Sequence, residues 1–87
     1  MPDEAALREF ARLAIRRGTL PRRDPAGVWA GPGEGAFCDA CERPITQDQL
    51  EYELEFAPES GHPGQDKVLF HLRCFAAWEF ERTKPAK

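Results

Sequence analysis

The cysteines and one histidine of this chain fall into two pairs with the same spacing. Cys38 and Cys41 stand in FCDACERPI, and His71 and Cys74 stand in FHLRCF, which gives the pattern C-x2-C-x29-H-x2-C. Two intervening residues let a tight turn, or one turn of helix, direct both side chains of a pair toward one ion. Three thiolates and one imidazole form a closed tetrahedral ligand set for zinc. We therefore expect one structural Zn²⁺ ion, bound by Cys38, Cys41, His71 and Cys74.

Other interpretations of the cysteine pairs fit the sequence less well. A redox-active Cys-x-x-Cys pair usually begins a helix after a buried strand, whereas Cys38 follows a Gly-rich segment and Cys74 would have no role. A disulfide framework disagrees with an odd number of cysteines. Another transition metal or an iron–sulfur cluster remains open, although such clusters favour four thiolates. The second histidine, His62, lies in the turn-rich SGHPG segment, where a solvated histidine is expected.

Catalysis has little support in the sequence. A catalytic zinc ion needs an open coordination position, and the chain shows neither a Ser/His/Asp set nor a nucleophile beside a base. The Gly-rich GPGEGAF segment lacks the lysine and the Ser/Thr of a phosphate-binding loop. We therefore expect that the protein is not an enzyme.

Length and composition are typical of one small domain. The chain has 87 residues, of which 31% are charged, and its net charge is −3. Domains of this size often need a metal in addition to their hydrophobic core. No apolar run approaches the roughly 20 residues that cross a bilayer, and the initial MPDEAALREF does not resemble a signal peptide. These features predict a cytoplasmic protein with reduced thiols and no membrane partner.

Residues 1–18 are expected to form an N-terminal amphipathic helix that ends at Gly18. One face of this helix carries the apolar side chains of Leu7, Phe10, Ala11, Leu13 and Ala14. Such a stripe would suit either an intramolecular contact or a dimer. The helix and the residues after it also carry six arginines, which could solvate a helix face or bind a nucleic acid: Arg8, Arg12, Arg16, Arg17, Arg22 and Arg23.

Residues 19–36 are rich in glycine and proline, and we expect them to form a linker without regular structure. Trp29 is the one large aromatic residue of this segment. We expect its ring to fold back over the edge of the core.

Residues 37–84 are expected to form the metal-binding domain, of α+β class. The segment LEYELEF, residues 50–56, alternates apolar residues with glutamates and predicts a strand with one buried face. KVLFH, residues 67–71, predicts a second strand that completes a hairpin. From residue 72 to about 83 the pattern becomes helical. The order of this domain is thus a knuckle that carries the first ligand pair, a β-hairpin and a C-terminal helix.

These elements and ligand pairs resemble a treble-clef zinc finger. The H-x2-C ending is similar to the first half of a LIM domain. The gap of 29 residues is similar to that of the poly(ADP-ribose) polymerase zinc finger, which binds DNA breaks. The resemblance covers residues 37 to about 80. The positions that fit this finger are Cys38, Cys41, Ile45, Phe70, His71 and Cys74.

Several positions depart from that finger. Asp39 and Gln47 stand where it carries basic residues, and Leu69 replaces a tryptophan. Because DNA affinity depends mainly on Lys and Arg, the resemblance implies the zinc site and the fold rather than DNA binding. The stretch from GPGEGAFCDACERPI through EYELEF to FHLRCFAAWE also resembles a group of small uncharacterised bacterial zinc-finger proteins. That resemblance implies a bacterial cytosolic protein.

We expect the function to be that of a protein-interaction or regulatory adaptor. A closed zinc site makes a rigid platform, and Glu51, Glu53 and Glu55 would form an acidic ridge suited to a basic protein surface. The same glutamates would also keep an edge strand soluble. The alternative is nucleic-acid binding through the Arg-rich N-terminal segment, with Trp29 stacked on an unpaired base.

Overall fold

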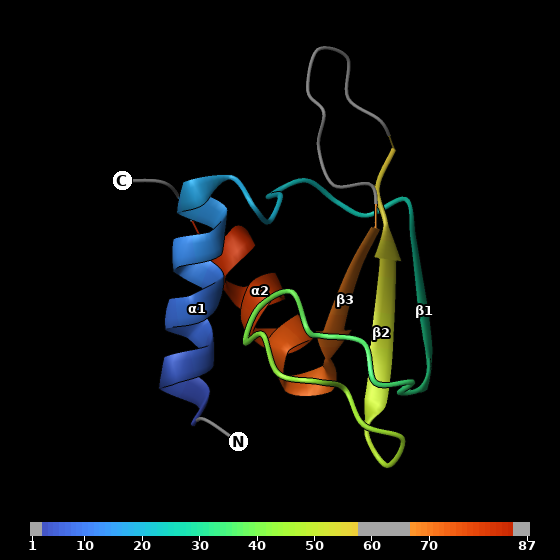
Figure 1. Ribbon diagram of the computed structural model, residues 1–87. Coiled ribbons are helices and arrows are strands. Elements are labelled where there is room, and N and C mark those ends of the chain that lie inside the picture. The colour runs from blue at the N-terminus through green and yellow to red at the C-terminus, as the bar shows by residue number, and fades with distance from the viewer. Residues whose placement is uncertain (1–2, 58–66, 85–87) are drawn as a thin grey trace.

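The computed structural model describes residues 3–57 and 67–84 of the 87-residue chain. It is a small α+β protein, as predicted, with two helices and a three-stranded sheet (Figure 1). Neither helix of the described residues is long and apolar enough to span a membrane. The elements in chain order are α1 (Glu4–Arg17), β1 (Gly27–Pro32), β2 (Leu50–Glu55), β3 (Lys67–His71) and α2 (Leu72–Arg82).

The sheet has the order β1-β2-β3, and both of its pairings are antiparallel. The predicted hairpin is therefore present as β2 and β3, with Leu54 opposite Val68. The predicted linker, in contrast, carries strand β1, so the expectation that it lacks regular structure is wrong for Gly27–Pro32. Strand β1 pairs with the whole length of β2. Its glycines lower its own strand propensity, and proline is tolerated there because β1 is an edge strand.

Trp29 does not fold over the core, and that expectation is also wrong. It lies in β1 opposite Glu53, and 54% of its surface is exposed. Cross-strand partners point to the same face of a sheet. Trp29 therefore shares the face of the glutamates, whereas Leu54 points to the opposite face and into the core.

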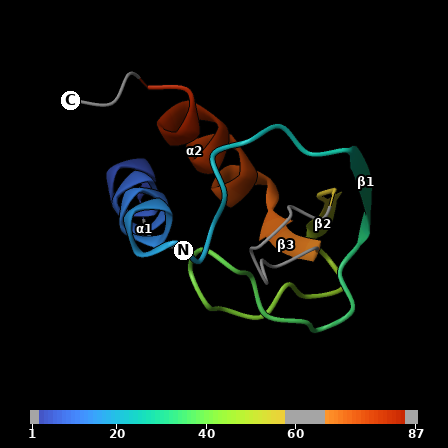
Figure 2. The same ribbon diagram turned by 90° about the horizontal axis from the view of Figure 1, so that it is seen from above.

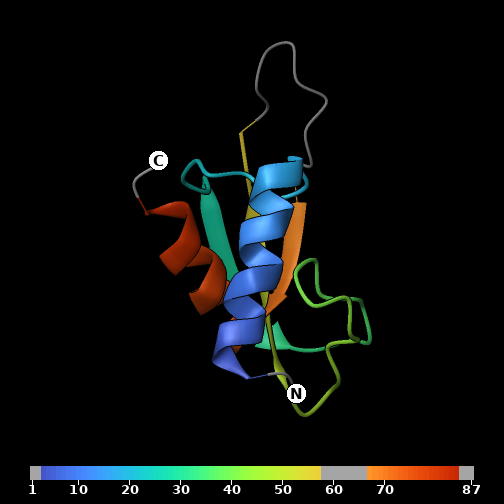
Figure 3. The same cartoon turned by 90° about the vertical axis from the view of Figure 1, so that its left-hand side faces the viewer.

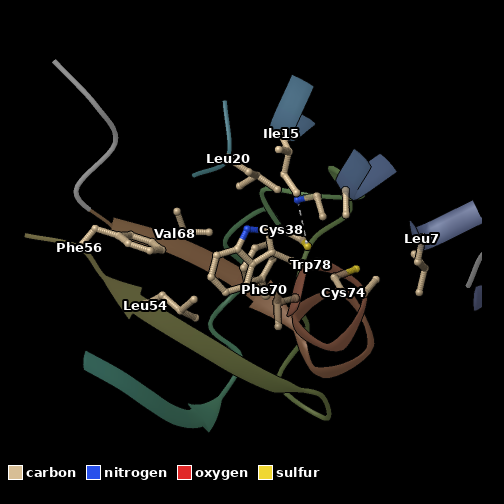
Figure 4. Close-up of a cluster of buried hydrophobic side chains, with 14 residues drawn as sticks. Leu7, Ile15, Leu20, Cys38, Leu54, Phe56, Val68, Phe70, Cys74 and Trp78 are labelled. Atoms are coloured by element: carbon tan, nitrogen blue, oxygen red, sulfur yellow. Dashed lines mark hydrogen bonds between the residues drawn. The ribbon is translucent and has the colours of Figure 1, made fainter. Parts of the chain in front are cut away.

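The core lies among the sheet, both helices and the loop between β1 and β2 (Figure 4). Trp78 of α2 is fully buried, and its ring centroid lies 5.6 Å from that of Phe70 in β3 and 6.0 Å from that of Phe56. The indole N–H of Trp78 donates a hydrogen bond to the carbonyl oxygen of Pro21, at 2.8 Å. This one side chain thus joins the helix, the sheet and the segment after α1.

Helix α1 packs against α2 in the same chain (Figures 1 and 3). Asp3 accepts a hydrogen bond from the backbone N–H of Ala6 at its start, and Gly18 ends it in the left-handed conformation, with φ of 83°. The predicted apolar face is confirmed at Leu7 and Ala11, but it is wrong at Phe10, which is 38% exposed. The residues of the helix that are buried are Leu7, Ala11 and Ile15.

Two of the six arginines hold this helix pair together. The Arg12 side chain donates a hydrogen bond to the buried carboxylate of Glu81, at 3.2 Å, which raises the pKa of Arg12. The guanidinium of Arg8 lies over the ring of Phe80, 4.4 Å from its centroid. Arg8 and Arg12 therefore contact α2 and do not only face water.

Candidate metal centre

The structure brings the four predicted ligands together. One donor atom from each residue lies within 4.8 Å of all the others, and none of the three cysteines is in a disulfide. Cys38 and Cys41 come from the loop between β1 and β2, whereas His71 ends β3 and Cys74 lies in the first turn of α2. Cys38 and Cys74 are members of the buried cluster and lie on the side of Trp78 that faces α1 (Figure 4). The four residues are positioned to coordinate one metal ion.

A short hairpin shapes the loop that carries the first pair. The backbone N–H of Ile45 donates to the carbonyl oxygen of Ala36 at 2.7 Å, and that of Cys38 donates to Arg43 at 2.9 Å. Glu42 adopts a positive φ of 63° just after the second cysteine. This turn reverses the chain, so that the side chains of both cysteines face the same point.

Glycine allows the two arms of this loop to lie close together. A Cβ atom at Gly33 would stand 2.2 Å from the carbonyl oxygen of Thr46, and the N–H of Gly33 donates to Gln49 at 2.9 Å. The N–H of Gly35 donates to the carbonyl oxygen of Ile45. The Gly-rich segment of the sequence therefore serves close backbone approach at the metal centre.

Hydrogen bonds fix the orientation of the histidine ligand. His71 Nε2 lies 3.2 Å from the carbonyl oxygen of Pro44 and 3.1 Å from Oε1 of Gln49. The same Gln49 oxygen accepts from the N–H of Thr46, at 2.9 Å. Two acceptors at Nε2 favour the proton on that nitrogen, so the lone pair of Nδ1 is free to bind a metal. Nδ1 lies 3.4 Å from the sulfur of Cys41.

The three thiols differ in acidity because they share one small space. A hydrogen bond with the Cys74 thiol lowers the pKa of Cys38 to about 4, and the same contact raises the pKa of Cys74. Burial raises the pKa of Cys41. All three can ionise together only with a cation among them.

The donor set and its spacing fit a zinc ion. Zn–S bonds of about 2.3 Å give a tetrahedron with edges of about 3.8 Å, and the donor atoms here lie within 4.8 Å of one another. Movements of the donor atoms by about 1 Å would bring them to the distances of a tetrahedral zinc site. Cys38, His71 and Cys74 are buried, and Cys41 is half-buried.

Asp39 ties the ligand loop to the sheet, a role that the sequence analysis missed. Its backbone N–H donates to the carbonyl oxygen of Leu69, at 2.8 Å. Its carboxylate accepts from the N–H of Leu69, also at 2.8 Å. These two bonds occupy the edge of β3 that does not face β2. An aspartate between two paired cysteines was the available signal, because a short acidic side chain readily binds nearby backbone N–H groups.

Replacing Asp39 with alanine should loosen the metal centre. The Leu69 N–H would lose its acceptor, which typically costs about 1 to 3 kcal/mol. We expect a lower denaturation midpoint of the zinc-loaded protein and faster zinc transfer to a chromogenic chelator. Asp39→Asn keeps a carbonyl acceptor and should retain most of the stability. An equal loss in both variants would show that the charge matters and not the hydrogen bond.

The other predicted functional residues are dispersed. Arg23 donates to the carbonyl oxygen of Ala57, at 3.0 Å, and lies over the ring of Phe56, whereas Arg16, Arg17 and Arg22 are exposed. Trp29 lies in β1, on the opposite side of the molecule from α1 (Figure 2). The cross-strand neighbours of Trp29 are therefore the glutamates of β2 and not the arginines of α1.

A surface groove separates the ligand loop from α1. A groove of about 600 Å³ runs between α1 and this loop, lined by Leu13 and Arg17 on one side and by Phe37 and Glu42 on the other. Phe37 is largely exposed. The groove borders the metal centre, because Cys38 also lines it.

Comparison with protein-family models, with curated proteins and with solved structures finds no match to this chain. The resemblance to treble-clef zinc fingers therefore stays a prediction. The metal centre is defined by its four ligands and by the Pro44 and Gln49 oxygens that orient His71.

Proposed function

We propose that this protein is a zinc-stabilised protein-interaction module of the treble-clef class. One observation carries the proposal. Four soft or borderline donors meet at the junction of the ligand loop, β3 and α2, and the hydrogen bonds of His71 orient one of them for metal binding. The loop before β2 supplies Cys38 and Cys41. The end of the β2–β3 hairpin supplies His71, and α2 supplies Cys74.

A structural role for the ion follows from the number and the burial of the ligands. Zinc in structural sites has four protein ligands, whereas catalytic zinc keeps one position for water or substrate. His71 is 4% exposed, Cys38 1% and Cys74 0%, so a substrate would have little access to the ion. Free thiols at all three cysteines suit a reducing compartment such as the bacterial cytoplasm.

Interaction with another protein is the role that the outer surface supports. Strand β1 forms one edge of the sheet, and the groove beside α1 presents the exposed ring of Phe37. Surface apolar groups that border charged side chains are typical of protein contacts. A rigid metal centre would hold both surfaces in a fixed arrangement.

Cobalt substitution tests the closed metal site. Co²⁺ in place of zinc should give the visible spectrum of a tetrahedral site with thiolate ligands, and azide or imidazole should leave that spectrum unchanged. Cys41→Ser removes the half-buried ligand and serves as the control, whose spectrum should respond to azide. A response in the unaltered protein would reveal an open position and contradict the structural role.

Capture from the host cell tests the interaction role. Immobilised zinc-loaded protein should retain a protein partner that the chelated, unfolded chain does not retain. If both forms capture the same set of proteins, or if the zinc-loaded form captures none, the interaction role is wrong.

A further inference from the structure

Strand β1 leaves one backbone edge open within the described residues. The sheet ends at β1, which has β2 on one side only. The N–H of Gly33 donates across to Gln49, and antiparallel ladders bond through every second residue. Trp29 and Gly31 therefore direct their N–H and C=O groups toward β2, whereas those of Val28 and Ala30 point away from the sheet.

Trp29 lies flat along its own strand on the outer face. A Cβ atom at Gly27 would stand 2.4 Å from Cη2 of the Trp29 ring, so the ring covers the glycine and turns its other side to solvent. Gly27 is paired with Glu55, and Trp29 is paired with Glu53. Cross-strand partners have their Cβ atoms about 5 Å apart. The indole thus lies beside two carboxylates.

Charges around the indole favour a cationic ligand. Glu55 is exposed, and among the described residues Glu53 forms one ion pair, with Lys67, whose Nζ lies 3.6 Å away. Glu51, on the same face, is half-buried, and its Oε1 has no hydrogen-bond partner among the described residues. Three carboxylates against one ammonium group leave this face acidic. An aromatic ring beside carboxylates attracts guanidinium and ammonium groups.

We propose that the open edge of β1, with Trp29, Glu53 and Glu55, binds an extended, arginine-rich segment of a partner protein. The segment adds a fourth strand through the backbone groups of Val28 and Ala30. Because side chains alternate along a strand, arginines at every second position would stand on the face of the indole. This inference rests on the proposed interaction role and names its surface and its partner chemistry.

The probe is a five-residue peptide with alternating arginine and valine, titrated into the zinc-loaded protein. Trp29 is the exposed one of the two tryptophans, so its fluorescence should change on binding. We expect Trp29→Ala and E53Q/E55Q each to weaken binding by about tenfold. Gly27→Ala forces the ring to move without a change of charge and should weaken binding by about threefold. Melting temperatures of the zinc-loaded variants should stay close to that of the unaltered protein.

Controls separate this surface from others. E34Q/E42Q removes two exposed carboxylates of the loop after β1 and should leave affinity within about twofold, the screened effect of charges outside the strand. A peptide with glutamine for arginine should not bind. A peptide N-methylated at alternate residues cannot pair with β1 and should also fail. Normal binding of the methylated peptide, or of the peptide to Trp29→Ala, would overturn the proposal.

Failure of this inference can be told apart from failure of the proposed function. Loss of binding in E34Q/E42Q but not in E53Q/E55Q would place the peptide in the groove beside α1, where Glu42 lies. That result would overturn the β1 site and keep an interaction module. If the peptide does not bind at all, the β1 site is wrong, and the cobalt spectra and the capture experiment still decide the metal and interaction roles by themselves.

Discussion

Removal of zinc should unfold residues 37–82, and Cys74→Ser should do the same in the presence of zinc. Cys74 is fully buried at the start of α2 and meets His71 and Cys38 at the metal centre. Structural zinc contributes roughly 10 to 16 kcal/mol in small metal-binding domains at neutral pH. That range matches or exceeds the whole stability of a typical domain, about 5 to 15 kcal/mol.

The measurement is a thermal melt followed by circular dichroism, before and after addition of a chelator. The unaltered protein should lose its cooperative transition with the chelator and regain it with zinc. Arg73→Ala, one residue from Cys74 and exposed, is the matched control and should melt like the unaltered protein. A cooperative melt of Cys74→Ser without zinc would show that the core is stable by itself and that the metal has another purpose.

Trp78→Ala should have the second largest effect, a loss of about 3 to 5 kcal/mol in the free energy of unfolding of the zinc-loaded protein. The ring fills the space between α2 and the sheet, and the guanidinium of Arg82 lies over it, 4.7 Å from its centroid. Its deletion leaves a cavity and frees the carbonyl oxygen of Pro21, which accepts the indole N–H.

Denaturant titration in excess zinc would measure this loss separately from metal affinity. Trp78→Phe keeps much of the ring but cannot donate to Pro21, and it should lose less than Trp78→Ala. Leu50→Ala, at an exposed leucine of β2, gives the expected effect of an apolar truncation outside the core. If Trp78→Ala were no worse than Leu50→Ala, the packing between α2 and the sheet would not be the main source of stability.

The metal centre and the hairpin could be predicted because their signals are local. The spacing within each ligand pair depends only on a turn or a helical turn, and the alternation of residues 50–56 depends only on the pleat of one strand. Both signals are complete within a few residues. The structure places the four ligands together and β2 beside β3, as those signals indicate.

Strand β1 and the burial of Ile15 in place of Phe10 depend on tertiary contacts and could not be predicted. Nothing in the glycine-rich segment specifies a strand, because β1 forms by pairing with β2. Along α1, Leu7 and Ala11 were predicted to be buried, whereas packing against α2 leaves Phe10 exposed and buries Ile15. The bond between Asp39 and Leu69 joins residues 30 positions apart. Such contacts appear only when the fold is assembled.

One ligand pair, Cys38 and Cys41, comes before the other pair in the sequence, with 29 residues between the two pairs, and we expect this separation to affect the order of folding. The turn around Cys38 and Cys41 closes through its own backbone hydrogen bonds, so this pair can capture an ion while the rest of the chain is still open. The second pair follows only when the 29 residues between Cys41 and His71 form a closed loop, at an entropic cost of about 3 kcal/mol. A metal ion would therefore meet the two thiolates of Cys38 and Cys41 first, and formation of the β2–β3 hairpin would bring the second pair to it.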